Sequence, residues 1–158
     1  MRTAIVHGTL SCMDGTRAFR KSAGTFANCE KAPDYAELTP LRIPAGWSIG
    51  WNQLHRDKRV EDGDFGGSSV FYATNPGRRF VIDVEFRPEH NPDGHFELTV
   101  QYQPWPRDAR GRRQNDAPFA FDANAKLMHS IETRSYAELI EQLETWLARC
   151  TIWSVEGN

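Results

Sequence analysis

Three carboxylates in the most regular segment of the sequence have the spacing of an acid–base pair. The segment FVIDVEFRPEHNPDGHFELTVQY (80–102) places Asp83 and Glu85 in one apolar–polar alternation and Glu97 in the next. Same-face neighbours on a strand lie roughly 7 Å apart, which glycosidase-like or nuclease-like pairs tolerate. The sequence supplies no nucleophile, histidine partner or pocket beside them. The pattern favours a solvated face or an acidic protein-binding patch over catalysis.

A second acidic group occurs in the charged loop RDKRVEDGDFGGSS (56–69). Its carboxylates are Asp57, Glu61, Asp62 and Asp64. The glycines of this loop do not make a phosphate-binding loop, because that motif needs a lysine and a following helix. The chain also lacks a GxSxG elbow and a cysteine in a protease-like or phosphatase-like context. We therefore predict that the protein is not an enzyme and has no catalytic residue.

The histidines offer two weak patterns for a metal ion. His90 and His95 flank the loop EHNPDGH and could meet a cation together with Asp93, but such residues more often decorate a hairpin turn. The other candidate ligands are too dispersed for a zinc site: His7, Cys12 and Cys29. The sequence predicts neither a metal nor a cofactor.

A basic loop, QPWPRDARGRRQNDAP (103–118), gives the one indication of nucleic-acid binding. Trp105 precedes Arg107, Arg110, Arg112 and Arg113, and arginines beside an aromatic ring can hold phosphate and stack a base. However, the chain has a formal charge of −2 and a pI near 6.2, whereas general nucleic-acid binders carry a cationic excess. Nucleic acid is therefore an unlikely partner, and a solvated loop is the alternative.

These groups require a sheet to position them. Strand patterns occur in GWSIGWNQL (46–54), SVFYAT (69–74), the two halves of 80–102 and KLMHSIET (126–133). The alternation places Trp47, Ile49 and Trp51 on one apolar face, and Trp47 and Trp51 are expected to be core residues. By the same rule Leu127, His129 and Ile131 share a side. Trp105 and Trp153 remain as candidate surface anchors.

The clearest helix follows Ser135. Ser135 and Glu138 match a capping box, in which each side chain satisfies an amide of the first turn. Apolar residues then recur at steps of three and four along 136–150, which predicts a helix lying on a sheet. The expected fold class is α+β: an antiparallel meander of about five strands covered on one face by a C-terminal amphipathic helix. The other face stays open to solvent or a partner.

The bulk properties of the 158 residues fit one such domain. We expect an N-terminal extension over residues 1–40 and a single α+β domain over 41–158. No apolar run approaches a membrane span, and the first residues do not form a convincing signal, so no membrane association is expected. Three cysteines without a CxxC pattern indicate free thiols and a cytoplasmic location.

Three segments in this order resemble a family of small bacterial immunity proteins encoded beside polymorphic toxins, including those of contact-dependent growth inhibition. They are IPAGWSIGWNQL (43–54), RRFVIDVEFRPEHNPDGHFELTVQY (78–102) and SIETRSYAELIEQLETWL (130–147). Family members similarly run from an IP-x-GW opening, through a strand with I-D and a Pro, to a closing S-x-x-E helix. The resemblance covers about residues 41–150.

The resemblance implies a cytoplasmic, non-enzymatic protein that binds and neutralises one cognate toxin domain. Many such toxins attack nucleic acid through basic clefts, which an acidic face could occupy. Our hypothesis for the toxin-binding residues is therefore the two acidic groups with one aromatic: Asp83, Glu85, Glu97, Asp57, Glu61, Asp62, Asp64 and Trp105. The alternative is a small RNA-associated protein that uses the Trp105–Arg113 loop.

Overall fold

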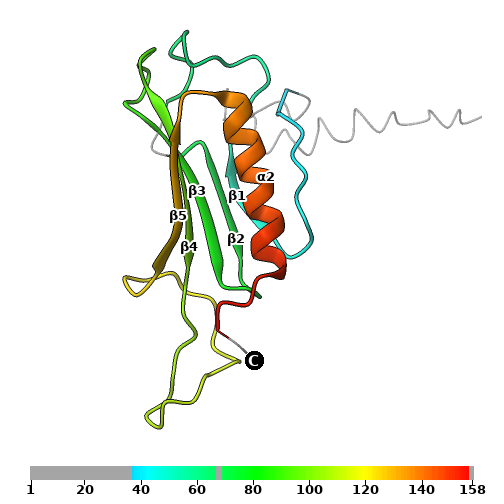
Figure 1. Ribbon diagram of the computed structural model, residues 1–158, viewed down its shortest axis with the longest axis vertical. Coiled ribbons are helices and arrows are strands. Elements are labelled where there is room, and N and C mark those ends of the chain that lie inside the picture. Colours follow the sequence, from blue (N-terminus) through cyan, green and yellow to red (C-terminus); the bar gives the residue numbers. More distant parts are fainter. Residues whose placement is uncertain (1–36, 67–68, 157–158) are drawn as a thin grey trace, which may run out of the picture. The chain divides into compact units, whose positions relative to one another are not determined.

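The structure is a computed structural model that describes residues 37–66 and 69–156. These residues form one antiparallel sheet with the strand order β1-β2-β3-β4-β5 and one helix, α2 (Figure 1). The elements are β1 (Ser48–Asn52), β2 (Phe71–Asn75), β3 (Phe80–Arg87), β4 (His95–Tyr102), β5 (Lys126–Thr133) and α2 (Tyr136–Ile152). The predicted α+β meander with a C-terminal helix is confirmed.

The core lies between one face of the sheet and α2. Alternate residues of the central hairpin, such as Ile82, Val84 and Leu98, are fully buried. The helix contributes Leu139, Leu143, Trp146, Leu147 and Cys150. Each buried large apolar side chain stabilises the fold by about 1.5–3 kcal/mol relative to its exposed state. The apolar side chains at every second strand position thus pack against the apolar side chains that recur every three or four residues along α2.

The start of α2 follows half of the predicted capping box. The Ser135 hydroxyl accepts a hydrogen bond from the Glu138 amide at 3.2 Å. The Glu138 carboxylate accepts from the hydroxyl of Thr133 at 2.5 Å, and not from the Ser135 amide. The Ser135 amide instead donates to Thr133 Oγ1 at 3.0 Å. Thr133, the last residue of β5, therefore completes the helix cap.

A segment that we call the strap, residues 37–47, runs beside the helix before the chain enters β1 (Figure 1). Arg42 forms an ion pair with Glu144 at 2.9 Å. Trp47 donates through Nε1 to the Leu147 carbonyl at 3.1 Å and to Thr151 Oγ1 at 3.0 Å. The strap thereby joins the beginning of the described chain to α2.

Residues 37–40, which the sequence predicts to belong to an N-terminal extension, contact this domain. Leu38 forms a β-bridge with His55, and the Thr39 amide donates to the Leu54 carbonyl at 2.7 Å. The Thr39 and Tyr136 hydroxyls lie 2.8 Å apart. The rest of the predicted extension, with His7, Cys12 and Cys29, lies outside the described residues.

Four buried apolar side chains tie the loop between β1 and β2 to the core: Leu54 and Val70 at its ends, and Val60 and Phe65 in its middle. Val60 is almost fully buried and Phe65 is fully buried. The Phe65 ring lies 4.8 Å from that of Phe96, 5.4 Å from Phe86 and 5.9 Å from Tyr136. The loop therefore closes the end of the core on the helix side of the sheet.

Two β-bulges change the faces predicted for the outer strands. The register between β1 and β2 shifts at Gly50, so Trp51 lies opposite Tyr72 and points away from α2. A second shift places Leu127 opposite Gln101 instead of on the side of His129. The prediction that Trp51 is a core residue is wrong: half of its surface is exposed (50%), and Leu127 is 61% exposed. An extra residue in a strand reverses the alternation beyond it.

Candidate protein-docking face

The open face is the side of the sheet that points away from α2. No helix or strand of residues 37–66 and 69–156 packs on it (Figure 1). Strand alternation and register assign its charged and large members: Trp51, Tyr72, Asp83, Glu85, Arg87, His95, Glu97, Leu127 and Glu132. The three hairpin carboxylates predicted from the sequence share this face, as the alternation requires.

Two rows of side chains cross the open face because the strands pair in register. One row runs from Trp51 through Tyr72 to Asp83. The other consists of three glutamates on neighbouring strands, Glu85, Glu97 and Glu132. Adjacent strands are about 4.8 Å apart, so side chains within a row are neighbours. The face therefore combines an aromatic edge with an acidic row.

Asp83 is the most enclosed of the predicted carboxylates. Its Oδ1 accepts a hydrogen bond from the Ser69 hydroxyl at 2.7 Å. Partial burial raises the pKa of the Asp83 carboxyl, the Ser69 hydrogen bond opposes this shift, and the nearby Glu85 charge adds to it. Burial, and then the charge of Asp83, raise the pKa of the neighbouring Tyr72 phenol. Asp83 is thus held within the face rather than presented from it.

Glu85 is paired by a residue of its own strand. Arg87, two positions along, places a guanidinium nitrogen 2.6 Å from the Glu85 carboxylate and donates a second hydrogen bond through Nε at 2.7 Å. This hydrogen bond, and then the charge of Glu85, raise the pKa of the exposed Arg87 guanidinium. The strand alternation that exposes Glu85 also places Arg87 on the open face, so the predicted acidic face includes a basic residue.

The other two glutamates meet around His95. The Nε2 atom of His95 lies 3.2 Å from Glu97 Oε1 and 3.8 Å from Glu132 Oε2. His95 therefore groups with Glu97 and Glu132, and not with His90 and Asp93 as predicted; Glu132 was not among the predicted residues. Asp93 instead lies 4.0 Å from Arg134. The sequence signal that could have placed Glu132 on this face is the alternation of residues 126–133. The bulge at Met128 interrupts that alternation.

The second predicted acidic group does not join the first. The Asp64 carboxylate accepts from the Arg59 amide at 3.0 Å within its own loop. Phe65, one residue further on, packs into the core on the helix side of the sheet. Asp57, Glu61 and Asp62 are exposed on the same loop. The two acidic groups therefore belong to different surfaces.

Trp105 is held by two arginines rather than left free as a surface anchor. The guanidinium of Arg79 lies 4.6 Å from the centre of its ring, and that of Arg113 lies 4.5 Å away. The Trp105 amide donates to Glu156 at 3.4 Å. Trp153, the other predicted anchor, is also half-buried and stacks on Phe80 at 5.7 Å.

Most arginines of the basic loop contact other groups of this chain. Arg107 pairs with Glu156 at 3.2 Å, and Arg112 pairs with Asp108 at 2.9 Å. With Arg113 placed over Trp105, three of the four arginines in the Trp105–Arg113 segment contact groups of this chain. The Arg107 and Arg112 side chains remain 57% and 72% exposed, so these ion pairs shape the loop without removing it from solvent.

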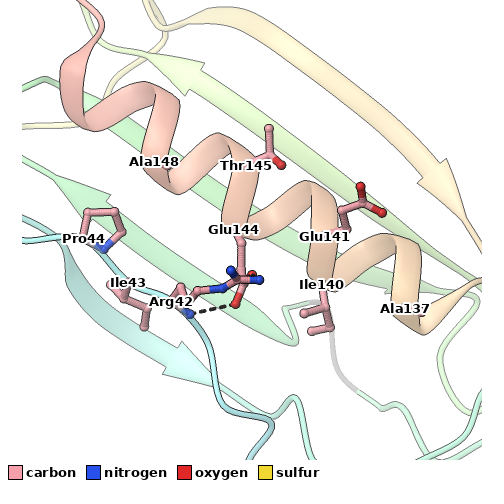
Figure 2. A pocket seen from close by; sticks show the side chains of 9 residues that line it. All are labelled: Arg42, Ile43, Pro44, Ala137, Ile140, Glu141, Glu144, Thr145 and Ala148. Atoms are coloured by element: carbon pink, nitrogen blue, oxygen red, sulfur yellow. Dashed lines mark hydrogen bonds and ion pairs between the residues drawn. The ribbon is translucent and has the colours of Figure 1, made fainter.

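A groove of about 760 Å³ lies between the strap and the outer side of α2 (Figure 2). Ile43 and Pro44 line one wall, and Ile140 and Ala148 line the other. The Arg42–Glu144 ion pair crosses the groove. Its lining contains no histidine or cysteine. The groove therefore offers apolar contact on both walls, with one ion pair across it.

The described part of the chain thus defines a class: an α+β protein in which one sheet face carries the core and the other is open. Comparisons with protein-family models, curated proteins and solved structures find no match to this chain. Among the described residues, no helix combines the length and the apolar character needed to cross a bilayer.

Proposed function

We propose that this protein is a cytoplasmic immunity protein that binds a cognate toxin domain through the open face and inhibits it stoichiometrically. The observation that carries the proposal is the composition of that face. Exposed apolar side chains stand at its two outer strands, Trp51 on β1 and Leu127 on β5, with charged residues between them. An acidic face with apolar anchors suits a basic protein partner.

The aromatic edge supplies the apolar part of such an interface. Trp51 and Tyr72 are adjacent on the open face, and neither is in the buried core. Tryptophan and tyrosine are enriched at interfaces because a large rigid ring buries much area at a small cost in conformational entropy. These two rings therefore make the best anchor for a partner.

The acidic row supplies charge complementarity. On β3, β4 and β5 the open face carries four carboxylates, those of Asp83, Glu85, Glu97 and Glu132, against the single arginine Arg87. Toxins that attack nucleic acid carry basic clefts. An acidic row steers association with such a cleft and excludes the substrate from it.

The test has two steps: a search for an adjacent gene that encodes a large secreted protein with a variable C-terminal domain, and co-expression of that domain with this chain. The chain should protect cells and form a one-to-one complex. Charge reversal by Glu97→Lys and Glu132→Lys should weaken binding at least about tenfold at low salt, and less at high salt where charges are screened. Glu141→Lys, on the outer side of α2, is the matched control.

Two results would overturn the proposal. The first is a toxin affinity that is the same in the charge-reversal double variant and in the control. The second is retained affinity for single-stranded RNA at moderate salt, lost on Arg110→Ala and Arg112→Ala, without any binding to the toxin domain. That second result would support the RNA-associated alternative.

A further inference from the structure

We propose that His95, Glu97 and Glu132 form a binding site for Zn²⁺ or a similar divalent transition metal on the open face. Their nearest ligand atoms all lie within 4.8 Å of one another. The inference does not depend on the proposed inhibition of a toxin, because the metal can be titrated against the protein alone.

The sheet places the three side chains together by register. His95 and Glu97 are two residues apart on β4, so they lie on the same face of the strand. Glu132 on β5 is the direct cross-strand partner of Glu97. The ligands therefore stand on two paired strands rather than on loops, which fixes their backbone positions. Only side-chain rotation is needed to close the site.

The required closure is small. Donor atoms around a tetrahedral zinc ion at about 2.0–2.1 Å lie about 3.3 Å from one another. The Nε2 atom of His95 is 3.2 Å from Glu97 and 3.8 Å from Glu132. The Glu132 side chain is 73% exposed, against 32% for His95 and 33% for Glu97, so it has the most freedom to move onto an ion.

The local charge also favours a cation. Within residues 37–66 and 69–156, neither Glu97 nor Glu132 forms an ion pair with a lysine or arginine. Arg87, the nearest guanidinium on β3, is held by Glu85. Two carboxylates thus converge on one imidazole, and a divalent ion neutralises both at once.

The ligand set selects the metal. One imidazole nitrogen and two carboxylate oxygens are ligands that zinc accepts, and a fourth position remains for water. Calcium takes six to eight oxygen ligands and magnesium prefers an octahedral oxygen shell, so both should bind weakly here. The exposed position of the site leaves the fourth ligand open to exchange.

Isothermal titration of the full-length, untagged protein with ZnCl₂ tests the site. We expect saturable binding, at least about tenfold weaker in His95→Gln and Glu97→Gln. Glu141→Gln, which removes an exposed carboxylate on the outer side of α2, away from the ligand set, should change the affinity by less than about threefold. CaCl₂ at the same concentrations should give no saturable heat. Unchanged thermal unfolding in the variants would exclude misfolding as the cause.

Two outcomes would contradict the site: one in which the three residues form only ion pairs with one another, and one in which zinc binds to cysteine thiols. Absence of saturable zinc binding, or equal affinity in the wild type and His95→Gln, would overturn the proposal. Titration with Co²⁺ separates the two sites, because thiolate ligands give a charge-transfer band that His and Glu ligands do not. A cobalt spectrum with that band, unchanged by His95→Gln, would place the metal on thiols and refute the assignment.

Discussion

The guanidinium of Arg79 lies over the ring of Trp105, with its central carbon 4.6 Å from the ring centre. Arg79 is buried and directs its nitrogens at backbone carbonyls: Nε donates to Gln103 at 3.0 Å, and the terminal nitrogens donate to Pro104 and Pro118 at 3.4 and 3.5 Å. Burial lowers the pKa of this guanidinium. One cation therefore organises the loop that follows β4.

Replacing Arg79 with Met should destabilise the protein by about 2–3 kcal/mol, because three backbone carbonyls, including that of the buried Gln103, lose their donor. Urea denaturation followed by tryptophan fluorescence measures the change. Arg110→Met, in the same loop but exposed, should stay within about 0.5 kcal/mol of the wild type. Equal stability of the two variants would show that Arg79 does not organise the loop.

Replacing Phe65 with Ala should cost about 3–5 kcal/mol, the range for deleting a buried aromatic ring, although Phe65 lies in a loop. The ring packs against Phe86, Phe96 and Tyr136 at the end of the core. Chemical denaturation gives the free energy of unfolding, with the exposed Glu61→Ala as control. A loss below about 1 kcal/mol would mean that the loop is not part of the core.

The two tryptophans around the Gly50 bulge should separate stability from binding. Trp47→Ala breaks the contact between strap and helix and should cost about 2–4 kcal/mol of folding free energy. Trp51→Ala should change stability by less than about 1 kcal/mol but weaken partner binding by about 2 kcal/mol, roughly thirtyfold. Denaturation curves and binding isotherms of both variants test this. A large loss of stability in Trp51→Ala with unchanged partner binding would contradict the exposed position that the Gly50 bulge gives Trp51.

The Asp83 carboxyl should make stability depend on pH. Since burial raises its folded-state pKa, the native state favours the protonated form, and its contribution is lost as pH rises through that pKa. Asp83→Asn, which keeps an oxygen acceptor for Ser69, should therefore raise the melting temperature at pH 7 more than at pH 3. Asp116→Asn, an exposed change, should give the same small difference at both values. A gain in melting temperature that is larger at pH 3 than at pH 7 would contradict a raised pKa for Asp83.

The alternation of the hairpin and the period of the helix were sufficient to predict the fold, since both patterns report which residues are buried. Trp51 and Leu127 were misplaced because a bulge adds one residue without leaving a mark in the apolar pattern. The role of Arg79 was not visible either, because its acceptors are backbone carbonyls that every sequence contains.

The candidate site was predicted in part. The shared face of Asp83, Glu85 and Glu97 follows from strand periodicity alone. The ligand grouping around His95 does not, since it depends on which residue of β5 stands opposite Glu97. Cross-strand register is set by the turn and the bulge together, and local sequence states neither with certainty.

The strap and the meander differ in how far apart their contacting residues are in the chain. Every strand pairs with its neighbour in sequence, so the sheet can grow by successive hairpins at a small cost in loop closure. The Trp47–Leu147 hydrogen bond joins residues 100 positions apart. Folding should accordingly proceed from the central hairpin outward, with the strap closing over α2 as the last and most reversible step.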